Sequence, residues 1–159
     1  MTGKITIYTD GGCEGNPGIG GYGIIMEYND GNKIISKEFY QGYEMTTNNR
    51  MELLAVIVGL EKIKKENQKV QIFSDSKYVV DPVAKQWLFN WEKKYFAKGG
   101  KPRINADLWK RFLLVYRKHQ VKIEWVRGHD SNPRNERCDH LVAIARKGEL
   151  LIDKGFPPI

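Results

Sequence analysis

The stretch KITIYTD, residues 4–10, decides the fold of this chain because it predicts a first strand that ends in an acidic side chain. Apolar and polar residues alternate through it, which is the pattern of a half-buried strand. A second apolar run, VQIFSD at residues 70–75, also ends in aspartate. We expect these two strands to be parallel neighbours, and ligands of such sheets gather beyond the carboxyl ends of the strands. The side chains of Asp10 and Asp75 are therefore predicted to share one site.

The other elements follow from apolar periodicity and turn residues. Strands are predicted over residues 22–28, 33–43 and 121–126, and helices over 47–65, 105–118 and 133–148, with a short helical stretch from 76. A loop is predicted over the glycine-rich residues 11–18. Strands that alternate with helices after an opening antiparallel meander indicate the α/β class, with a mixed five-stranded sheet and helices on both faces.

Length and composition indicate one compact domain over residues 1–159. A chain of 159 residues with 41% hydrophobic residues can bury a sizeable core. The longest apolar stretch, residues 53–60, is far shorter than the ~20 residues that span a bilayer, and no signal-peptide pattern opens the chain. We therefore expect a cytoplasmic protein that is monomeric, has no membrane partner and keeps Cys13 and Cys138 reduced. The tail, about residues 150–159, is expected to be loosely ordered.

Basic residues are concentrated in one segment. The net charge is +7 and the isoelectric point about 9.3, which favours a polyanionic partner such as nucleic acid. Residues 85–103 contain six Lys or Arg residues but Glu92 as the one acid, with aromatic residues between them. This composition predicts a basic protrusion that grips phosphates. The alternative is a solvated helix pair whose aromatic side chains belong to the core.

Four acidic residues stand where the predicted elements would aim them at one place: Asp10, Glu52, Asp75 and Asp139. Glu52 opens a strongly apolar helix and Asp139 lies on the last one. Two unit charges ~4 Å apart cost roughly 4 kcal/mol at an effective dielectric of ~20, so cations or protons must compensate such a group. Ligands that are all oxygens favour Mg²⁺ or Mn²⁺. Any one of these acids taken alone would be a solvated or capping carboxylate.

Gly18, Gly20 and Gly23 match the spacing of a dinucleotide-binding motif, but a predicted strand follows them instead of a helix. Their context therefore indicates close approach of the backbone to another backbone or to a ligand.

Five short motifs occur in this order along the chain: DGG at 10–12, TTNNRMEL at 46–53, SDSKYV at 74–79, WVRGH at 125–129 and NERCD at 135–139. Together they closely resemble the type 1 ribonuclease H family over residues 4–147. The resemblance implies the ribonuclease H-like fold with strand order 3-2-1-4-5 and one antiparallel strand between edge and centre. It also implies hydrolysis of the RNA strand of RNA–DNA hybrids by a two-metal-ion mechanism, which leaves a 3′-hydroxyl and a 5′-phosphate.

The resemblance assigns roles to the site residues. Asp10 would bridge two Mg²⁺ ions, Glu52 and Asp75 would help to hold one of them, and Asp139 would help to hold the other. Mn²⁺ would be able to replace Mg²⁺. His129 would assist proton transfer or product departure, for which a side chain that titrates near neutral pH is suited. A plain surface-loop histidine is the alternative for this residue.

Substrate contacts are implied in the same way. Residues near the site would touch the RNA minor groove or approach the DNA strand. The first group is Cys13, Glu14, Asn48 and Lys77, and the second is Thr47, Asn49 and Asn16. In the basic protrusion the contacts would be Trp87, Lys93, Lys94 and Lys98. Thr and Asn at a helix start are also ordinary caps, and at least one of them is expected to act as one.

Two other functions stay open on the sequence. One is a nuclease of the same fold that acts on DNA, against which the motif order and the asparagine pair at 48–49 argue. The other is a module that binds hybrids without catalysis. Loss of activity usually removes an acidic ligand, and none of the four is missing here. The residues at positions 77, 130–132 and 140 depart from those that many relatives carry.

Overall fold

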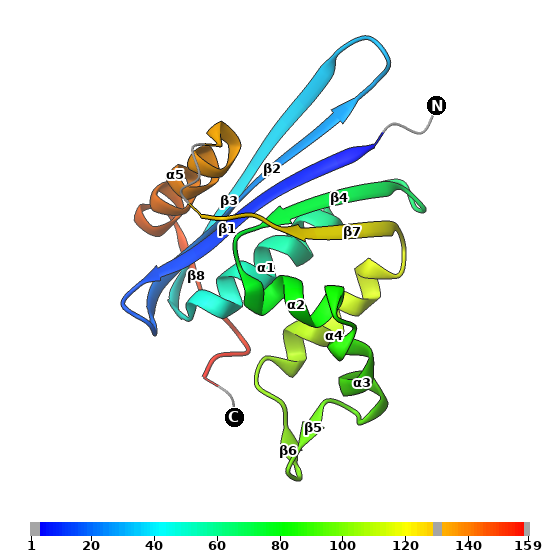
Figure 1. The fold of residues 1–159 in the computed structure, drawn as a ribbon. Helices are drawn as coiled ribbons and strands as arrows, with labels where there is room; N and C mark the ends of the chain where they lie inside the picture. The colour runs from blue at the N-terminus through cyan, green and yellow to red at the C-terminus, as the bar shows by residue number, and fades with distance from the viewer. Residues whose placement is uncertain (1–3, 129–131, 158–159) are drawn as a thin grey trace.

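The computed structural model describes residues 4–128 and 132–157, which form a six-stranded sheet flanked by helices (Figure 1). The strand order is β7-β4-β1-β2-β3-β8. The bounds are Ile5–Glu14 for β1, Gly18–Asn29 for β2, Ile34–Thr46 for β3, Lys69–Ser74 for β4, Gln120–Trp125 for β7 and Leu150–Leu151 for β8. Of these strands β2 alone runs against its neighbours, since β1–β4, β4–β7 and β3–β8 pair in parallel. The predicted order 3-2-1-4-5 is thus confirmed for the first five strands, and β8 is an addition at the edge.

Helices cover both faces of this sheet, as predicted. They are α1 Asn48–Glu61, α2 Lys77–Ala84, α3 Trp87–Lys93, α4 Ala106–Tyr116 and α5 Pro133–Lys147. Figure 1 shows α5 on one face and α1, with the other helices beyond it, on the opposite face. Alternate residues of a strand point to opposite faces of the sheet and pack against different helices. Ile7 and Ile24 lie against Gly59 of α1, whereas Ile25 packs with Cys138 and Leu141 of α5.

The central helix α1 is buried nearly all round. Its residues 53–60 are all buried, which agrees with the two apolar stripes expected of a central helix. The Thr47 Oγ1 accepts a hydrogen bond of 3.2 Å from the backbone N–H of Arg50, so Thr47 is the N-cap. The helix ends at Glu61, four residues before the predicted end, and a polar segment leads from there to β4.

The glycine-rich segment after residue 10 is not the loop that the sequence predicts. Strands β1 and β2 run through it and leave only residues 15–17 for the turn. Close packing is the reason that glycines stand in these strands. A Cβ on Gly11 would lie 2.4 Å from the carbonyl carbon of Met51, and one on Gly23 would lie 2.6 Å from the carbonyl oxygen of Cys138. Close backbone approach, which was expected of Gly18, Gly20 and Gly23, is therefore confirmed for Gly18 and Gly23, whereas the atoms nearest to Gly20 belong to the side chains of Thr46 and Cys13.

The basic segment projects beyond α4 as α3 and a small hairpin of β5 Ala97–Lys98 and β6 Lys101–Pro102 (Figure 1). Its apolar residues divide between two environments. Leu88 and Phe96 are buried, and the ring of Trp91 lies edge-on to Trp109 with centroids 5.7 Å apart. Trp87, by contrast, is 44% exposed. The core alternative thus holds for part of the aromatic set.

The expectation of a loose tail from residue 150 is wrong for the described residues. Leu150 and Leu151 pair with Gly42 and Tyr43 of β3, which creates the sixth strand. Two residues further on, Asp153 is only 7% exposed. The physical reason is an ion pair with a residue distant in the sequence.

That ion pair forms around Arg50 at the start of α1. Its Nε donates to Asp153 Oδ2 at 2.7 Å, and its terminal nitrogen donates to Asp107 Oδ2 at 2.8 Å. Thr46 Oγ1 donates to the same oxygen of Asp153 at 2.7 Å. Charged groups this deeply buried are stable only with such partners, so the network joins the tail to α1 and α4.

No helix within residues 4–128 and 132–157 combines the length and the apolar character needed to cross a bilayer.

We predict that Arg50→Ala lowers the free energy of unfolding by about 3–5 kcal/mol, because it leaves the Asp153 carboxylate buried and unpaired. Urea denaturation measures the change. The control is Arg111→Ala, which removes a half-exposed ion pair with Glu61 and is expected to cost under about 1 kcal/mol. Equal losses in the two variants would contradict the role given to the buried network.

Candidate metal centre and nucleic-acid interface

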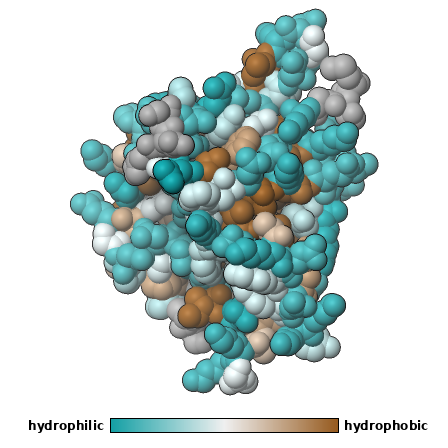
Figure 2. Space-filling view, viewed as in Figure 1, coloured by the Kyte–Doolittle hydropathy of each residue, from teal (hydrophilic) through white to brown (hydrophobic). Residues whose placement is uncertain are grey.

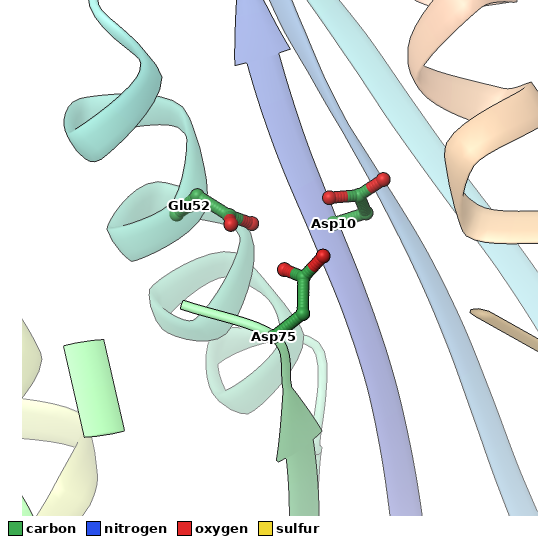
Figure 3. A group of neighbouring side chains, drawn as sticks. All are labelled: Asp10, Glu52 and Asp75. Carbon is green, nitrogen blue, oxygen red and sulfur yellow. The ribbon is translucent and has the colours of Figure 1, made fainter. Parts of the chain in front are cut away.

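Three carboxylates converge where β1 and β4 separate. The parallel ladder of these strands ends at the pair Tyr8 and Phe73, and the residues two places beyond on each strand are Asp10 and Asp75. Figure 3 shows both side chains pointing toward that of Glu52, which comes from α1. One oxygen of each carboxylate lies within 4.8 Å of the other two. The structure therefore brings together the three acids from three separate elements.

Gly11 allows α1 to approach β1 closely enough for Glu52 to join this group. A Cβ on Gly11 would lie 2.6 Å from the backbone nitrogen of Glu52, a separation that real side chains do not allow. Since Gly11 follows Asp10 directly, its missing side chain lets the first turns of α1 rest on β1 beside that aspartate. The backbone N–H of Gly11 also donates to Asp10 Oδ1 at 2.9 Å, which orients the carboxylate.

The charged forms of Asp10 and Glu52 are destabilised in this cluster. Burial, followed by the charge of Asp75, raises the pKa of Asp10 to about 7. Burial and then the charge of Asp10 raise the pKa of Glu52 well above its usual range. Asp10 and Glu52 thus resist ionisation because they are buried and lie beside other acids.

The cluster fits a divalent cation. Glu52 Oε1 and Asp75 Oδ1 are buried and find no hydrogen-bond partner among the residues the structure describes. Buried oxygens of this kind normally have a donor or a cation beside them. Since all the candidate ligands are oxygens, the donor set suits Mg²⁺ or Mn²⁺.

Asp139 lies across an open cleft from the cluster. The cleft has a volume of about 200 Å³, and its walls include Asp10, Asp75, Asn135 and Asp139. Asp139 is exposed on α5 and stands outside the tight group of three, but its charge contributes to the raised pKa of Asp10. The fourth predicted ligand thus faces the same space from the opposite face of the sheet.

His129 lies outside the described residues. The segment can be followed from β7 as far as Gly128, where a Cβ would stand 2.9 Å from Asp75 Oδ2. The residue before His129 therefore lies directly against the carboxylate cluster.

Three of the predicted substrate residues form one hydrogen-bonded group. Asn48 Oδ1 accepts from the backbone N–H of Cys13 at 2.8 Å, and the backbone N–H of Asn48 donates to Asn16 Oδ1 at 3.1 Å. The group joins the β1–β2 turn to the start of α1. Thr47 serves as the helix cap, whereas Glu14 and Asn49 are exposed beside the group.

Lys77 contacts Trp125, a residue with no predicted role, and Trp125 in turn contacts Asp75. The Lys77 Nζ stands 4.6 Å from the ring centre of Trp125, and the Trp125 indole N–H donates to the Asp75 carbonyl oxygen at 3.0 Å. Trp125 thereby connects the end of β7 to Asp75, the residue that follows β4. The sequence signal was present, since Trp125 opens the WVRGH motif, but the direction of its side chain depends on the sheet.

The protrusion residues are separate from the carboxylates. Lys93, Lys94 and Lys98 are exposed, and Trp87 has Lys85 Nζ 5.2 Å from its ring centre. Figure 2 shows that most of this face of the molecule is hydrophilic. These side chains thus offer free cations at a distance from the metal centre.

Loss of one carboxylate is expected to stabilise the protein in the absence of divalent ions. Because the pKa of Asp10 is raised from 3.8 to about 7, its protonated form favours the fold below pH 4, and this contribution is lost as the pH rises through 7. At pH 7.5 in chelator, Asp10→Asn should therefore raise the free energy of unfolding by on the order of 2 kcal/mol.

Thermal melts with chelator and with Mg²⁺ measure this effect. Glu44→Gln removes an exposed acid of β3 and serves as the control for net charge. Mg²⁺ should stabilise the unsubstituted protein more than Asp10→Asn. If chelator made Asp10→Asn the less stable protein, the repulsion inferred from the cluster would be refuted.

Comparisons with known proteins agree with the geometry of the site. The RNase H family model matches residues 2–147. A ribonuclease H of Desulforamulus reducens is 49% identical over 152 residues, which cover 94% of this chain and 92% of that protein. A ribonuclease H of Enterobacter sp. (strain 638) is 46% identical over 159 residues, or 99% of each chain. Among solved structures, LC9-RNase H1, a type 1 RNase H with the type 2 active-site motif, is similar with a TM-score of 0.83 at 30% identity over 93% of this chain and 74% of that one. This chain therefore belongs to the RNase H family.

Proposed function

We propose that this protein is an endonuclease that hydrolyses the RNA strand of RNA–DNA hybrids with two Mg²⁺ ions, or Mn²⁺ in their place, and leaves 3′-hydroxyl and 5′-phosphate ends. The observation that carries the proposal is the convergence of Asp10, Glu52 and Asp75 within 4.8 Å in a chain of the RNase H family. We further propose that it acts as a monomer in the cytoplasm, without an obligate protein partner.

The carboxylates would hold the ions. Asp10 belongs to the cluster with Glu52 and Asp75 and also lines the cleft with Asp139, so it would be the ligand shared by both ions. Glu52 and Asp75 offer buried oxygens on one side, and Asp139 offers an exposed carboxylate on the other. Bound divalent ions supply a nucleophile from water at neutral pH and counter the charge that grows on the phosphorus oxygens.

Two further features orient the reacting groups. Trp125 fixes the backbone of Asp75 by its indole hydrogen bond, and Gly128 lets the following segment approach the same carboxylate. We assign His129, the next residue, to proton transfer or product departure beside the attacked phosphate.

Selection of the hybrid is assigned to two surfaces. The group of Cys13, Asn16 and Asn48 joins the β1–β2 turn to the start of α1. In and around it, Cys13, Glu14, Asn48 and Lys77 would touch the minor groove of the RNA strand and sense its 2′-hydroxyl groups, whereas Asn16, Thr47 and Asn49 would approach the DNA strand. The exposed lysines of the protrusion, together with Trp87, would hold the backbone of the DNA strand.

Cleavage of labelled duplexes tests the proposal. With Mg²⁺ or Mn²⁺ we expect cleavage of the RNA strand of a hybrid, no cleavage with chelator, and intact double-stranded RNA and DNA. Asp10→Asn should lower kcat on the order of 10³-fold, or ~4 kcal/mol of transition-state stabilisation, because it removes the ligand shared by both ions.

The controls separate the competing functions. Glu44→Gln should cleave like the unsubstituted protein, and Asp10→Asn should still bind the hybrid. Binding without cleavage by the unsubstituted protein would favour a non-catalytic binding module, and equal attack on duplex DNA would favour a DNA nuclease.

A second prediction concerns the protrusion. Substitution of Lys93, Lys94 and Lys98 by Gln should weaken hybrid binding and reduce the slope of log affinity against log salt by about 2–3, since each phosphate contact contributes roughly 0.9. Fluorescence anisotropy over a range of salt concentrations measures both quantities.

The matched control replaces Lys33, Lys37 and Lys69 by Gln, which removes the same charge from exposed positions away from the protrusion. The control should keep most of the slope. Equal slopes in the two triple variants would mean that net charge, and not the protrusion, binds the hybrid.

A further inference from the structure

Arg146 is a cation in the wall of the cleft that has no role in the hydrolysis proposed above. It lies in the last turn of α5, beyond the NERCD motif, and lines the cleft together with Asp10, Gly12 and Asp139. It is half-buried, whereas the next residue, Lys147, is exposed.

Arg146 differs from most other arginines in having no anionic partner among the described residues. Five arginines form ion pairs with Asp or Glu side chains: Arg50, Arg111, Arg117, Arg134 and Arg137. Within the part of the chain that the structure describes, Arg146 forms neither an ion pair nor a side-chain hydrogen bond. A guanidinium that has lost part of its water favours an oxyanion, such as a carboxylate or a phosphate, that accepts two parallel hydrogen bonds.

Packing of α5 on the sheet brings Arg146 to this place. A Cβ on Gly21 of β2 would stand 2.9 Å from the Cβ of Ala145, so the last turn of α5 rests directly on the strand backbone. Arg146 is close enough to Cys13 for its charge to counteract part of the effect of burial on the pKa of that thiol. It therefore lies in the wall of the cleft that Asp10 lines, close to Cys13.

We propose that Arg146 binds a phosphate of the RNA strand adjacent to the scissile one, on the side of Cys13 and Asn48; this inference rests on the proposed function. The carboxylates and their ions are assigned to the scissile phosphate. A strand that passes from there to Cys13 carries its neighbouring phosphate along the wall where Arg146 lies. The guanidinium donates two parallel N–H groups to that phosphate.

Lys147 provides a matched control in the same helical turn. Both side chains sit at the C-terminal end of α5, where a positive charge is favourable to the helix dipole. Arg146→Met and Lys147→Met therefore remove the same charge from the same turn, but only the first removes a group from the cleft.

The test measures hybrid affinity in Ca²⁺ in place of Mg²⁺, with two substrates. One is an unmodified hybrid, and the other carries an uncharged methylphosphonate at the RNA phosphate next to the cleavage position. We expect Arg146→Met to weaken binding of the unmodified hybrid about tenfold and to reduce the salt slope by about one. Arg146→Lys should recover part of the affinity, whereas Lys147→Met should change it less than twofold.

The modified hybrid gives the deciding comparison. The unsubstituted protein should bind it about tenfold more weakly than the unmodified hybrid, whereas Arg146→Met should bind both alike. Equal loss in both proteins, or equal effects of Arg146→Met and Lys147→Met, would overturn the assignment. Thermal melts exclude a folding defect.

Failure of the proposed function has a different signature. If the unsubstituted protein bound the hybrid without cleaving it, the proposed hydrolysis would fail, while the comparison of the two hybrids would still decide on Arg146.

Discussion

Mutual repulsion of Asp10, Glu52 and Asp75 is the constraint on which the rest of this structure depends. The three carboxylates are held within 4.8 Å by elements that have no other reason to present acids at one point. Burial adds to the cost of the charges, and together with the neighbouring carboxylates it raises the pKa of both Asp10 and Glu52. The fold must therefore be stable enough elsewhere to keep the cluster together until cations reach it.

That stability comes from close packing around the cluster. Glycines at positions 11 and 23 let α1 and α5 approach the strands more closely than any other residue would allow. The buried helix α1 carries Glu52, and the pairing of Arg50 with Asp153 fixes the start of the same helix. Gly11 and a distant ion pair thus act on the one helix that carries Glu52.

Most of the sheet and the convergence of the acidic residues can be predicted from the sequence. The apolar runs that lead to Asp10 and Asp75 are predicted because alternation of apolar and polar residues is a local pattern. The extension of β1 and β2 through glycines was not predictable from propensity, since glycine disfavours strands unless another backbone lies close. The ordered tail depends on Asp153 meeting an arginine 103 positions earlier in the chain. The roles of Trp125 and Arg146 depend on which way a side chain points in the finished fold.

The most direct test of the central claim is a titration of the substrate-free protein with Mn²⁺, followed by paramagnetic broadening of its backbone amide signals. The account predicts that broadening begins at Gly11, Glu52 and Ser76 and that Asp10→Asn weakens it. Broadening spread evenly over exposed acids, or centred elsewhere on the molecule, would contradict the claim that the three carboxylates form a cation site.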